Sequence, residues 1–182
     1  MKLHTDSIYL RPLTWEDAAE LLELRRRNHE FFQLFEPIRP ASYLTLEGQQ
    51  ELIAQAISDF AKQTAFAFGV FLRDNDQMIG RVSLSNVARG AWQNATLGYF
   101  LDKELNGKGY TTAAVGLALR YAFTDGQLHR VQAGVMPRNL GSIRVLEKNG
   151  FRYEGLSLRY LQINGKWEDH NMYAITVEEW EK

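Results

Sequence analysis

Residues 95–122, ATLGYFLDKELNGKGYTTAAVGLALRYA, carry the pattern that decides the fold. The segment Ala95–Leu101 is rich in aromatic and β-branched residues, which is typical of a strand. One apolar stripe at helical spacing then follows, made of Ala114, Leu117, Ala118, Tyr121 and Ala122. Between strand and helix lies the turn Asn106–Thr112, which contains Gly-x-Gly. Such a turn delivers backbone N–H groups to a helix N-terminus, where a phosphate or pyrophosphate binds well.

The composition of this turn narrows the ligand class. Gly107 and Gly109 lack the Cβ that would block close approach, while Thr111 and Thr112 add hydroxyl donors and Lys108 adds charge. No Lys-Ser or Lys-Thr pair follows the glycines, so the turn is not a P-loop. The third glycine of a dinucleotide fingerprint is also missing. Taken alone, the segment is equally consistent with a plain strand-to-helix turn.

A second segment strengthens the prediction of a binding site. His129–Met136 is predicted to be a strand and Asn139–Asn149 a helix, with Gly150 at a left-handed C-terminal cap. A right-handed crossover makes this strand parallel to Ala95–Leu101, so both strands end at one edge of the sheet, where ligands of open α/β sheets bind. If the strands splay, their backbone groups can bond an extended amide-bearing ligand.

We therefore expect Phe100 and Leu101 to offer backbone groups to that ligand. Asn139 can donate and accept, which suits a pantetheine amide. Asn139 and Ser142 are equally ordinary residues at a helix start. The two interpretations are compatible.

The remaining elements predict an α+β (mixed α/β) architecture. Further strands are expected at Ser7–Leu13, Phe66–Leu72, Met78–Val87, Phe151–Ile163 and Lys166–Thr176, the last two joined by an Asn164-Gly165 hairpin turn. Thr14, with Asp17, and Thr45 are expected to open helices. The result is a central mixed, mostly antiparallel sheet with one parallel pair, flanked by helices. We expect one domain over residues 1–182.

Composition excludes several function classes. The formal net charge of -1 argues against bulk nucleic-acid binding. The chain has no Cys, which excludes disulfides, thiolate nucleophiles and Cys-based zinc sites. Two of the four His residues, His4 and His129, show no ligand spacing, and we expect no metal site. The polar N-terminus lacks a signal-peptide core and no stretch is apolar enough to cross a membrane, so we expect a cytoplasmic protein.

Two motifs resemble those of a known family. Asn106 to Thr111 resembles the pyrophosphate-binding motif of GNAT acetyltransferases, and Asn139-x-x-Ser142 with Glu147-Lys148-Asn149-Gly150-Phe151 is similar to their Asn…Lys-x-Gly-Phe motif. The resemblance runs from Leu10-Arg11-Pro12-Leu13 to Trp167-Glu168-Asp169-His170. Ser85-Asn86-Val87-Ala88-Arg89-Gly90 looks most like the Rim-type bacterial ribosomal-protein alanine N-acetyltransferases.

The resemblance implies the chemistry. Acetyl-CoA would be the cosubstrate, bound by Phe100, Leu101, Asn139, Ser142 and the turn Asn106, Gly107, Lys108, Gly109, Tyr110, Thr111 and Thr112. An amine would attack the thioester directly, with no covalent enzyme intermediate. Two positions depart from the motif: Asn106 replaces the usual Gln or Arg, and Thr111 the usual Gly or Ala. The Tyr that many relatives use as general acid falls near Leu146, which makes Ser142 its substitute.

The general base has several candidates. Glu36, Asp169 and His170 are suited by composition and expected position, although Glu36 could be solvated in a loop and the other two could be cross-strand pairs in a hairpin. The basic run Arg25-Arg26-Arg27 is typical of a solvated helix end, and it could instead meet ribosomal RNA or an acidic peptide.

Three hypotheses about the acceptor stay open. The enzyme could acetylate the N-terminal alanine of a ribosomal protein, or a small amine such as a polyamine or an antibiotic. The chain could also be a non-catalytic acyl-CoA-binding ribosome-assembly factor. A strongly acidic acceptor pocket would favour a polyamine. The sequence is compatible with a monomer or a homodimer.

Overall fold

The computed structural model describes residues 1–180 and contains one eight-stranded sheet with the order β1-β2-β3-β4-β5-β6-β8-β7. Neighbouring strands are antiparallel except β5 and β6, which are parallel. The strands are β1 (Leu3–His4), β2 (Ile8–Pro12), β3 (Phe66–Leu72), β4 (Met78–Ala88), β5 (Asn94–Leu101), β6 (Arg130–Val135), β7 (Arg152–Ile163) and β8 (Lys166–Thr176). The predicted mixed sheet with one parallel pair is confirmed.

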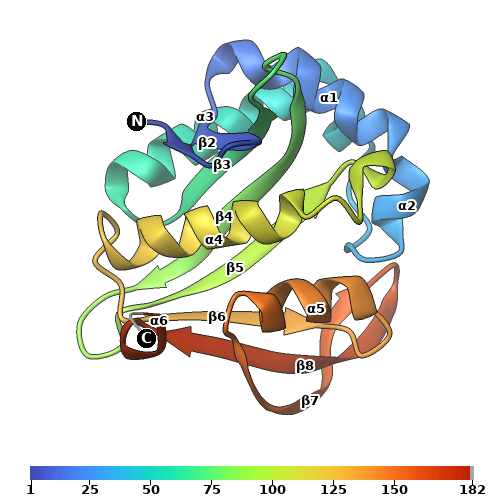
Figure 1. Ribbon diagram of the computed structural model, residues 1–182. Helices are drawn as coiled ribbons and strands as arrows, with labels where there is room; N and C mark the ends of the chain where they lie inside the picture. The colour runs from blue at the N-terminus through green and yellow to red at the C-terminus, as the bar shows by residue number, and fades with distance from the viewer. Residues whose placement is uncertain (181–182) are drawn as a thin grey trace.

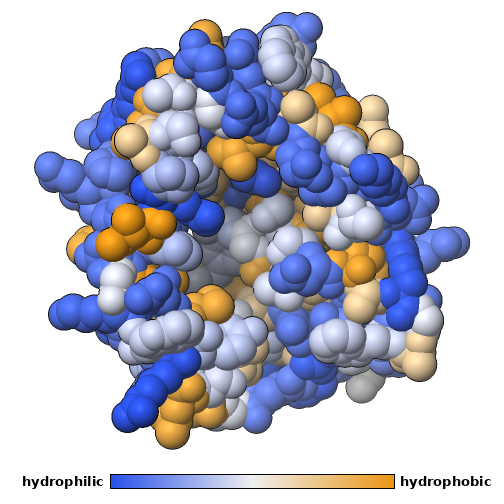
Figure 2. Space-filling view, turned by 180° about the vertical axis from the view of Figure 1, so that it is seen from behind, coloured by the Kyte–Doolittle hydropathy of each residue, from blue (hydrophilic) through white to orange (hydrophobic). Residues whose placement is uncertain are grey.

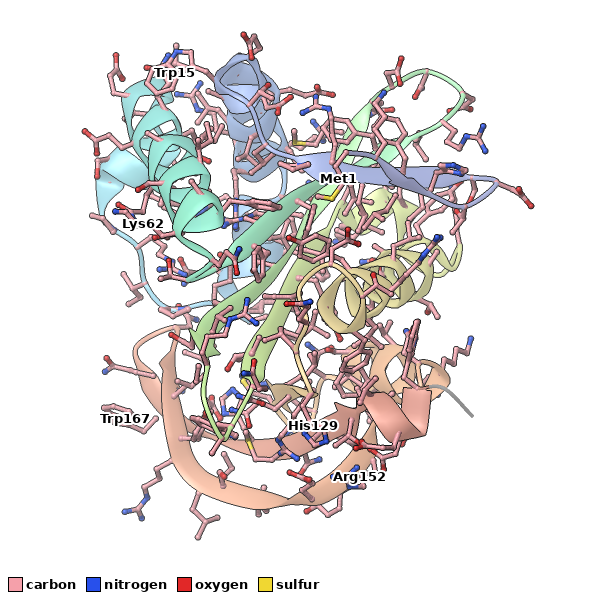
Figure 3. All side chains as sticks on the ribbon, turned by 90° about the vertical axis from the view of Figure 1, so that its left-hand side faces the viewer. Met1, Trp15, Lys62, His129, Arg152 and Trp167 are labelled. Atoms are coloured by element: carbon pink, nitrogen blue, oxygen red, sulfur yellow. The ribbon has the colours of Figure 1, made fainter. Side chains whose placement is uncertain are left out.

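Helices cover both faces of the sheet (Figure 1). They are α1 (Ala18–Arg27), α2 (His29–Gln33), α3 (Leu46–Lys62), α4 (Tyr110–Phe123), α5 (Leu140–Lys148) and α6 (Val177–Trp180), with short 3₁₀ turns at Trp15–Asp17, Ala41–Leu44 and Lys103–Leu105. The side view in Figure 3 places α3 and α4 on opposite sides of the sheet. In the part of the chain that the structure describes, no helix is long and apolar enough to cross a membrane.

The helix-start signals act as the sequence predicts. Thr14 and Asp17 form a capping box, and the side chain of Thr45 accepts a hydrogen bond from the Gly48 amide at 3.1 Å. Asn139 caps α5, its Oδ1 accepting from the Ser142 amide at 3.2 Å. Gly150 has a φ of +81° at the end of α5, the left-handed conformation expected there.

The core explains why α4 is apolar along one side. Ala114, Val115 and Ala118 of α4 are buried against Val82 and Leu97 of the sheet. On the opposite face, a second cluster joins α1 and α3 to the sheet through Leu21, Leu24, Ile53, Phe71 and Met78. These helices cover only part of that face: Gly98, in the middle of β5, is exposed.

The parallel strands β5 and β6 separate before they end. Backbone pairing covers only Asn94 to Thr96 on β5 and Arg130 to Gln132 on β6, while β5 continues to Leu101. The last residues of β5 therefore pair on the β4 side alone. This is the splay that the sequence allowed for, and it opens toward the N-termini of α4 and α5.

Arg89, in the turn between β4 and β5, links that turn to two other parts of the fold. Its guanidinium donates to the carbonyl oxygen of Gly126 at 2.8 Å and to the side-chain oxygen of Gln63 at 3.2 Å. The turn after β4 is thereby fastened to the end of α3 and to the turn that follows α4. These hydrogen bonds give Arg89 a structural role in that turn.

Candidate active site

The turn before α4 has an open backbone. Gly107 and Gly109 have φ values of +79° and +83°, and a Cβ built on either would meet nothing within 4 Å. Gly109 is the N-cap of α4 and no side chain caps it. The positive φ values favour glycine at both positions, and the free space lies next to the backbone.

The amides of this turn are free to bind a ligand. In residues 1–180, the backbone N–H groups of Gly107 to Thr112 donate no hydrogen bond to the protein, whereas the Asn106 amide is already bonded to Lys103. The first amides of a helix lack intrahelical partners, and the helix dipole adds positive potential at the same place. The turn therefore fits a pyrophosphate, as the sequence predicts.

The splay supplies a second set of backbone groups. The Asp102 amide donates to the Ile79 oxygen on the β4 side at 2.8 Å. Backbone groups alternate in direction along a strand, so those of Tyr99 and Leu101 point toward β6, where pairing has ended. Those of Phe100 point toward β4 instead, so the expectation that the Phe100 backbone serves the ligand is wrong. These groups can bond an extended ligand that runs from the turn into the splay.

A tyrosine bridges the splay to α5. The Tyr99 hydroxyl lies 2.7 Å from the Ser142 Oγ and 3.3 Å from the Ser142 carbonyl oxygen. Burial raises the pKa of Tyr99 to about 12, which the hydrogen bond with Ser142 only partly offsets. Tyr99 is therefore a phenol at neutral pH and can donate a proton in a hydrogen bond.

Leu146, which stands near the position of the general-acid tyrosine in relatives, takes no part in this arrangement. The side chain of Leu146 is fully buried in the main core and does not face the cleft. A tyrosine hydroxyl nevertheless reaches Ser142, but it comes from β5. The sequence analysis included Tyr99 only as part of the predicted strand Ala95–Leu101 and missed this role, because a long-range contact between β5 and α5 leaves no local signal.

Glu36 lines the same cleft as Tyr99 and Ser142, and contacts from two other elements hold it in position. Both carboxylate oxygens accept hydrogen bonds from the Arg25 guanidinium, at 2.7 and 2.9 Å, and the Arg25 side chain is only 6% exposed. The Glu36 carbonyl oxygen accepts from the Asn164 amide at the tip of the β7–β8 hairpin, at 2.9 Å. The alternative of a merely solvated loop residue does not fit Glu36, because Arg25 and Asn164 both bond to it and its side chain is only 22% exposed.

The basic run of α1 is also less exposed than the sequence suggested. Arg25 is buried against Glu36, and Arg27 donates twice to the Asp102 carboxylate at 2.7 and 2.9 Å. Arg26 is more exposed and donates to the Leu44 carbonyl oxygen. Two of the three cations have internal carboxylate partners, so the run is not the solvated helix end that its composition indicates.

The other two base candidates lie in the β7–β8 hairpin. The Asp169 Oδ1 accepts from the Arg159 amide at 2.8 Å, where a bulge gives Arg159 a φ of +49°. His170 is buried, and its Nδ1 lies 3.0 Å from the Glu168 carbonyl oxygen, which can only accept. Neither residue lines the cleft described below, and both have contacts that stabilise the irregular hairpin.

One cleft of about 520 Å³ joins most of these groups. Its floor and cofactor end comprise Tyr99, Phe100, Leu101, Asn106, Gly107, Gly109, Thr111, Thr112, Asn139, Gly141 and Ser142. Its far end comprises Phe31, Phe32, Phe35 and Glu36. Lys108 and Tyr110 do not line it.

Two cations in the cleft wall were not assigned to cofactor binding from the sequence. Arg144 and Lys148 of α5 line the cleft on the side of Ser142. They stand four residues apart, a spacing that places side chains on one helix face. That spacing was the available signal, and it suits an anionic ligand lying between α4 and α5.

Comparison with known proteins identifies the family. Residues 7–152 match the family described as Acetyltransferase (GNAT) domain. The chain is a GNAT acetyltransferase. It is 50% identical over 169 residues to the Probable N-acetyltransferase YjcK of Bacillus subtilis, covering 93% of each chain. It is 35% identical to the [Ribosomal protein uS5]-alanine N-acetyltransferase of Escherichia coli, over 99% of this chain and 93% of that one.

A solved relative carries the cofactor. The structure titled Mycobacterium smegmatis RimJ in complex with CoA-disulfide superposes with a TM-score of 0.92 at 30% identity, over 100% of this GNAT chain and 88% of that one. Membership of the family makes the chain an acetyl-CoA-dependent N-acetyltransferase. The free amides of Gly107 to Thr112 and the splayed strands fit the pyrophosphate and pantetheine of that cosubstrate.

Proposed function

We propose that this GNAT enzyme acetylates the N-terminal α-amine of a ribosomal protein, with alanine as the first residue, in a ternary complex with acetyl-CoA. The observation that carries the proposal is the single cleft that joins the amides of the turn to the carboxylate of Glu36. The 35% identity with the E. coli enzyme over nearly the whole chain supports the ribosomal acceptor.

Glu36 is the proposed base. An α-amine has a pKa of about 8, against about 10.4 for a lysine side chain, so an α-amine needs only weak assistance to become neutral. A carboxylate at the far end of the cleft can take its proton, directly or through a water molecule. Arg25 and the hairpin tip hold Glu36 in place, so little reorganisation is needed.

The splay and the Tyr99–Ser142 pair are proposed to act on the thioester, at its carbonyl oxygen and its leaving sulfur. Acetyl-CoA, when bound, supplies a thioester whose carbonyl carbon the amine attacks and whose thiolate leaves. The outward amides of Tyr99 and Leu101 can stabilise charge on the carbonyl oxygen. The Tyr99 and Ser142 hydroxyls, 2.7 Å apart, can donate to the departing sulfur.

The charge at the acceptor end weighs against a polyamine. A second cavity adjoins the cleft at Glu36. The charged or titratable residues in its lining are Arg25, His29, Arg39 and Glu36, of which Glu36 carries the carboxylate. A polycation would meet repulsion there, because like charges at close range are unfavourable. An N-terminal peptide brings one positive charge and loses it before reaction.

The test mixes the enzyme with acetyl-CoA and a panel of peptides starting with Ala, Ser or Met, together with spermidine, and measures free thiol release. Release that is greatest with the Ala-starting peptides is expected. Release with spermidine alone would replace the proposal by a small-amine function. Acetyl-CoA binding with no release from any acceptor would leave a non-catalytic binding protein.

A further inference from the structure

Two arginines near the acceptor end have no counter-ion: Arg81 on the sheet face opposite α4, and Arg39 in the loop that follows α2. Arg81 lies on β4 directly across from Phe100 of β5, and its Nε is buried with no hydrogen-bond partner. Within residues 1–180, neither Arg81 nor Arg39 forms an ion pair with a carboxylate. The part-buried Arg81 guanidinium is unfavourable without an anion, whereas Arg39 is exposed and adds positive charge beside it.

Their surroundings have an excess of positive charge. The Arg25 guanidinium lies 3.6 Å from the centre of the Phe100 ring and 5.1 Å from that of Tyr43, and Arg39 lies 5.3 Å from the same Tyr43 ring. Burial lowers the pKa of Arg81, and the charges of Arg25 and Arg39 lower it further, opposed by Tyr43 and Glu36. Glu36 is already engaged by Arg25, so it does not neutralise the other two cations.

Arg39 and the groups around it border a hollow that meets the cleft, while Arg81 lies on the adjoining sheet face and lines neither cavity. Arg25, Glu36, Arg39 and Tyr43 line a second cavity of about 320 Å³, and Glu36 and Phe32 line both cavities. Figure 2 shows the deep hollow on the face opposite α4, between the upper helices and the β7–β8 hairpin. Figure 3 places Trp167 of that hairpin on the same side of the sheet.

The floor of that face is polar and open. Ser83 and Ser85 of β4, and Thr96 and Gly98 of β5, share the face of Arg81 by strand alternation and register, and none of them is buried. A chain segment can therefore lie along the strands with its amine near Glu36. Its following side chains would then pass the unpaired guanidinium groups.

We infer that Arg81 and Arg39 form an anion-binding subsite for the acceptor, which selects peptides carrying an Asp or Glu side chain within the first few residues after the acetylated amine. The inference rests on the proposed function and adds a substrate preference to it. Guanidinium groups pair with carboxylates through charge-assisted hydrogen bonds. These bonds are stronger than hydrogen bonds between neutral groups.

The experiment measures kcat/KM for matched Ala-starting peptides that differ only by Glu or Gln at the second, third or fourth position. We expect at least one Glu peptide to be preferred by about tenfold, the effect of one charge-assisted hydrogen bond. R81Q and R39Q should each reduce this ratio toward one. R39E should reverse the preference toward a Lys peptide.

Controls separate recognition from folding and from the proposed function. Arg120 of α4 is exposed on the other side of the sheet, so R120Q should keep the wild-type preference. Because Arg39 is exposed, R39Q is expected to fold even if R81Q does not. Acetylation of Ala peptides with equal kcat/KM for Glu and Gln would overturn the subsite and leave the proposed function standing.

An added phosphate compound distinguishes the source of the anion. AMP is tested as an inhibitor competing with the peptide, in the wild type and in R81Q. Competitive inhibition that R81Q abolishes, with no preference among peptides, would overturn the peptide assignment in favour of a phosphate-bearing acceptor. Failure to acetylate any peptide would overturn the proposed function itself.

Discussion

The cofactor end and the acceptor end of the cleft are built from different parts of the chain. At the cofactor end, the groups that we propose to bind acetyl-CoA are main-chain amides of one short segment, Gly107 to Thr112, and the backbone of β5. At the acceptor end, the proposed groups come from distant elements: Arg25 of α1, Glu36 after α2, Arg81 of β4 and the backbone amide of Asn164 in the β7–β8 hairpin.

The difference has a physical reason. A diphosphate is the same in every acetyl-CoA, so a fixed set of amides at a helix N-terminus can serve any member of the fold. An acceptor varies from enzyme to enzyme, and variable side chains on loops and strand faces can adapt to it without changing the scaffold. The two ends should therefore respond differently to substitution.

The largest effect is expected from G109V. A β-branched side chain at a φ of +83° is strained, and its Cβ would occupy the open space beside the amides. We expect acetyl-CoA affinity to fall by about 100-fold or more, measured by calorimetry, since several amide bonds to one anion would be lost together.

Gly90 provides the matched control, because it also has a positive φ, +73°, with nothing within 4 Å of a built Cβ, in a turn distant from the cleft. G90V should cost a similar loss of stability, about 1–2 kcal/mol, without changing acetyl-CoA affinity. Equal affinity in G109V and G90V would show that the amides of the turn do not hold the pyrophosphate.

The next effect tests the acceptor end. E36Q removes the proposed base while keeping the shape of the side chain, so we expect kcat to fall by about 100-fold with acetyl-CoA affinity unchanged. D169N is the comparison, because Asp169 accepts a backbone hydrogen bond in the hairpin bulge. It should keep most of kcat and lose about 1 kcal/mol of stability.

An equal loss of kcat in the two variants would refute the assignment of Glu36. It would point instead to the hairpin as a whole, because Asn164 at its tip also contacts Glu36. The ratio of the two kcat values, measured at saturating peptide, is the deciding quantity.

These two ends also differ in how far the sequence could predict them. Gly107, Gly109 and Asn139 have local signatures, since helix starts and turns depend on neighbouring residues. The parallel pairing of β5 and β6 followed from the crossover, whereas the point where they separate is seen only in the structure. The Arg25–Glu36 pair, the Tyr99–Ser142 contact and the unpaired Arg81 depend on residues 11 to 43 positions apart, or on a side chain with no partner at all.

The β7 strand shows a third kind of limit. The Asn164-Gly165 turn was predictable, and both residues have positive φ values, +46° and +79°. The two bulges of β7, near Gly155 and Arg159, were not predicted. Asp169 therefore looked like a cross-strand partner in the sequence, whereas in the structure it supports the bulge at Arg159.

The smallest effect on activity is expected at Tyr99, which lies between the cofactor end and the acceptor end of the cleft. Y99F keeps the ring and removes the hydroxyl that contacts Ser142, so kcat should fall about tenfold, as for the loss of one hydrogen bond to a charged group. If the hydroxyl serves only packing, kcat will not change. S142A should give a similar loss, and the double variant Y99F/S142A should be no worse than either if the two hydroxyls act as one unit.

The raised pKa of Tyr99 gives an independent measure of the same group. Its folded pKa of about 12 exceeds the ordinary value of 10.0, so the unfolded chain ionises first as the pH rises. The stabilisation by a neutral Tyr99 is complete below pH 10 and is lost between pH 10 and pH 12, on the order of 2 kcal/mol in all. Y99F should lack this loss, so its unfolding free energy should fall less steeply than the wild type's over that interval. Parallel curves for the two proteins would mean that Tyr99 is solvated, and its hydroxyl would then not be the neutral donor that the cleft requires.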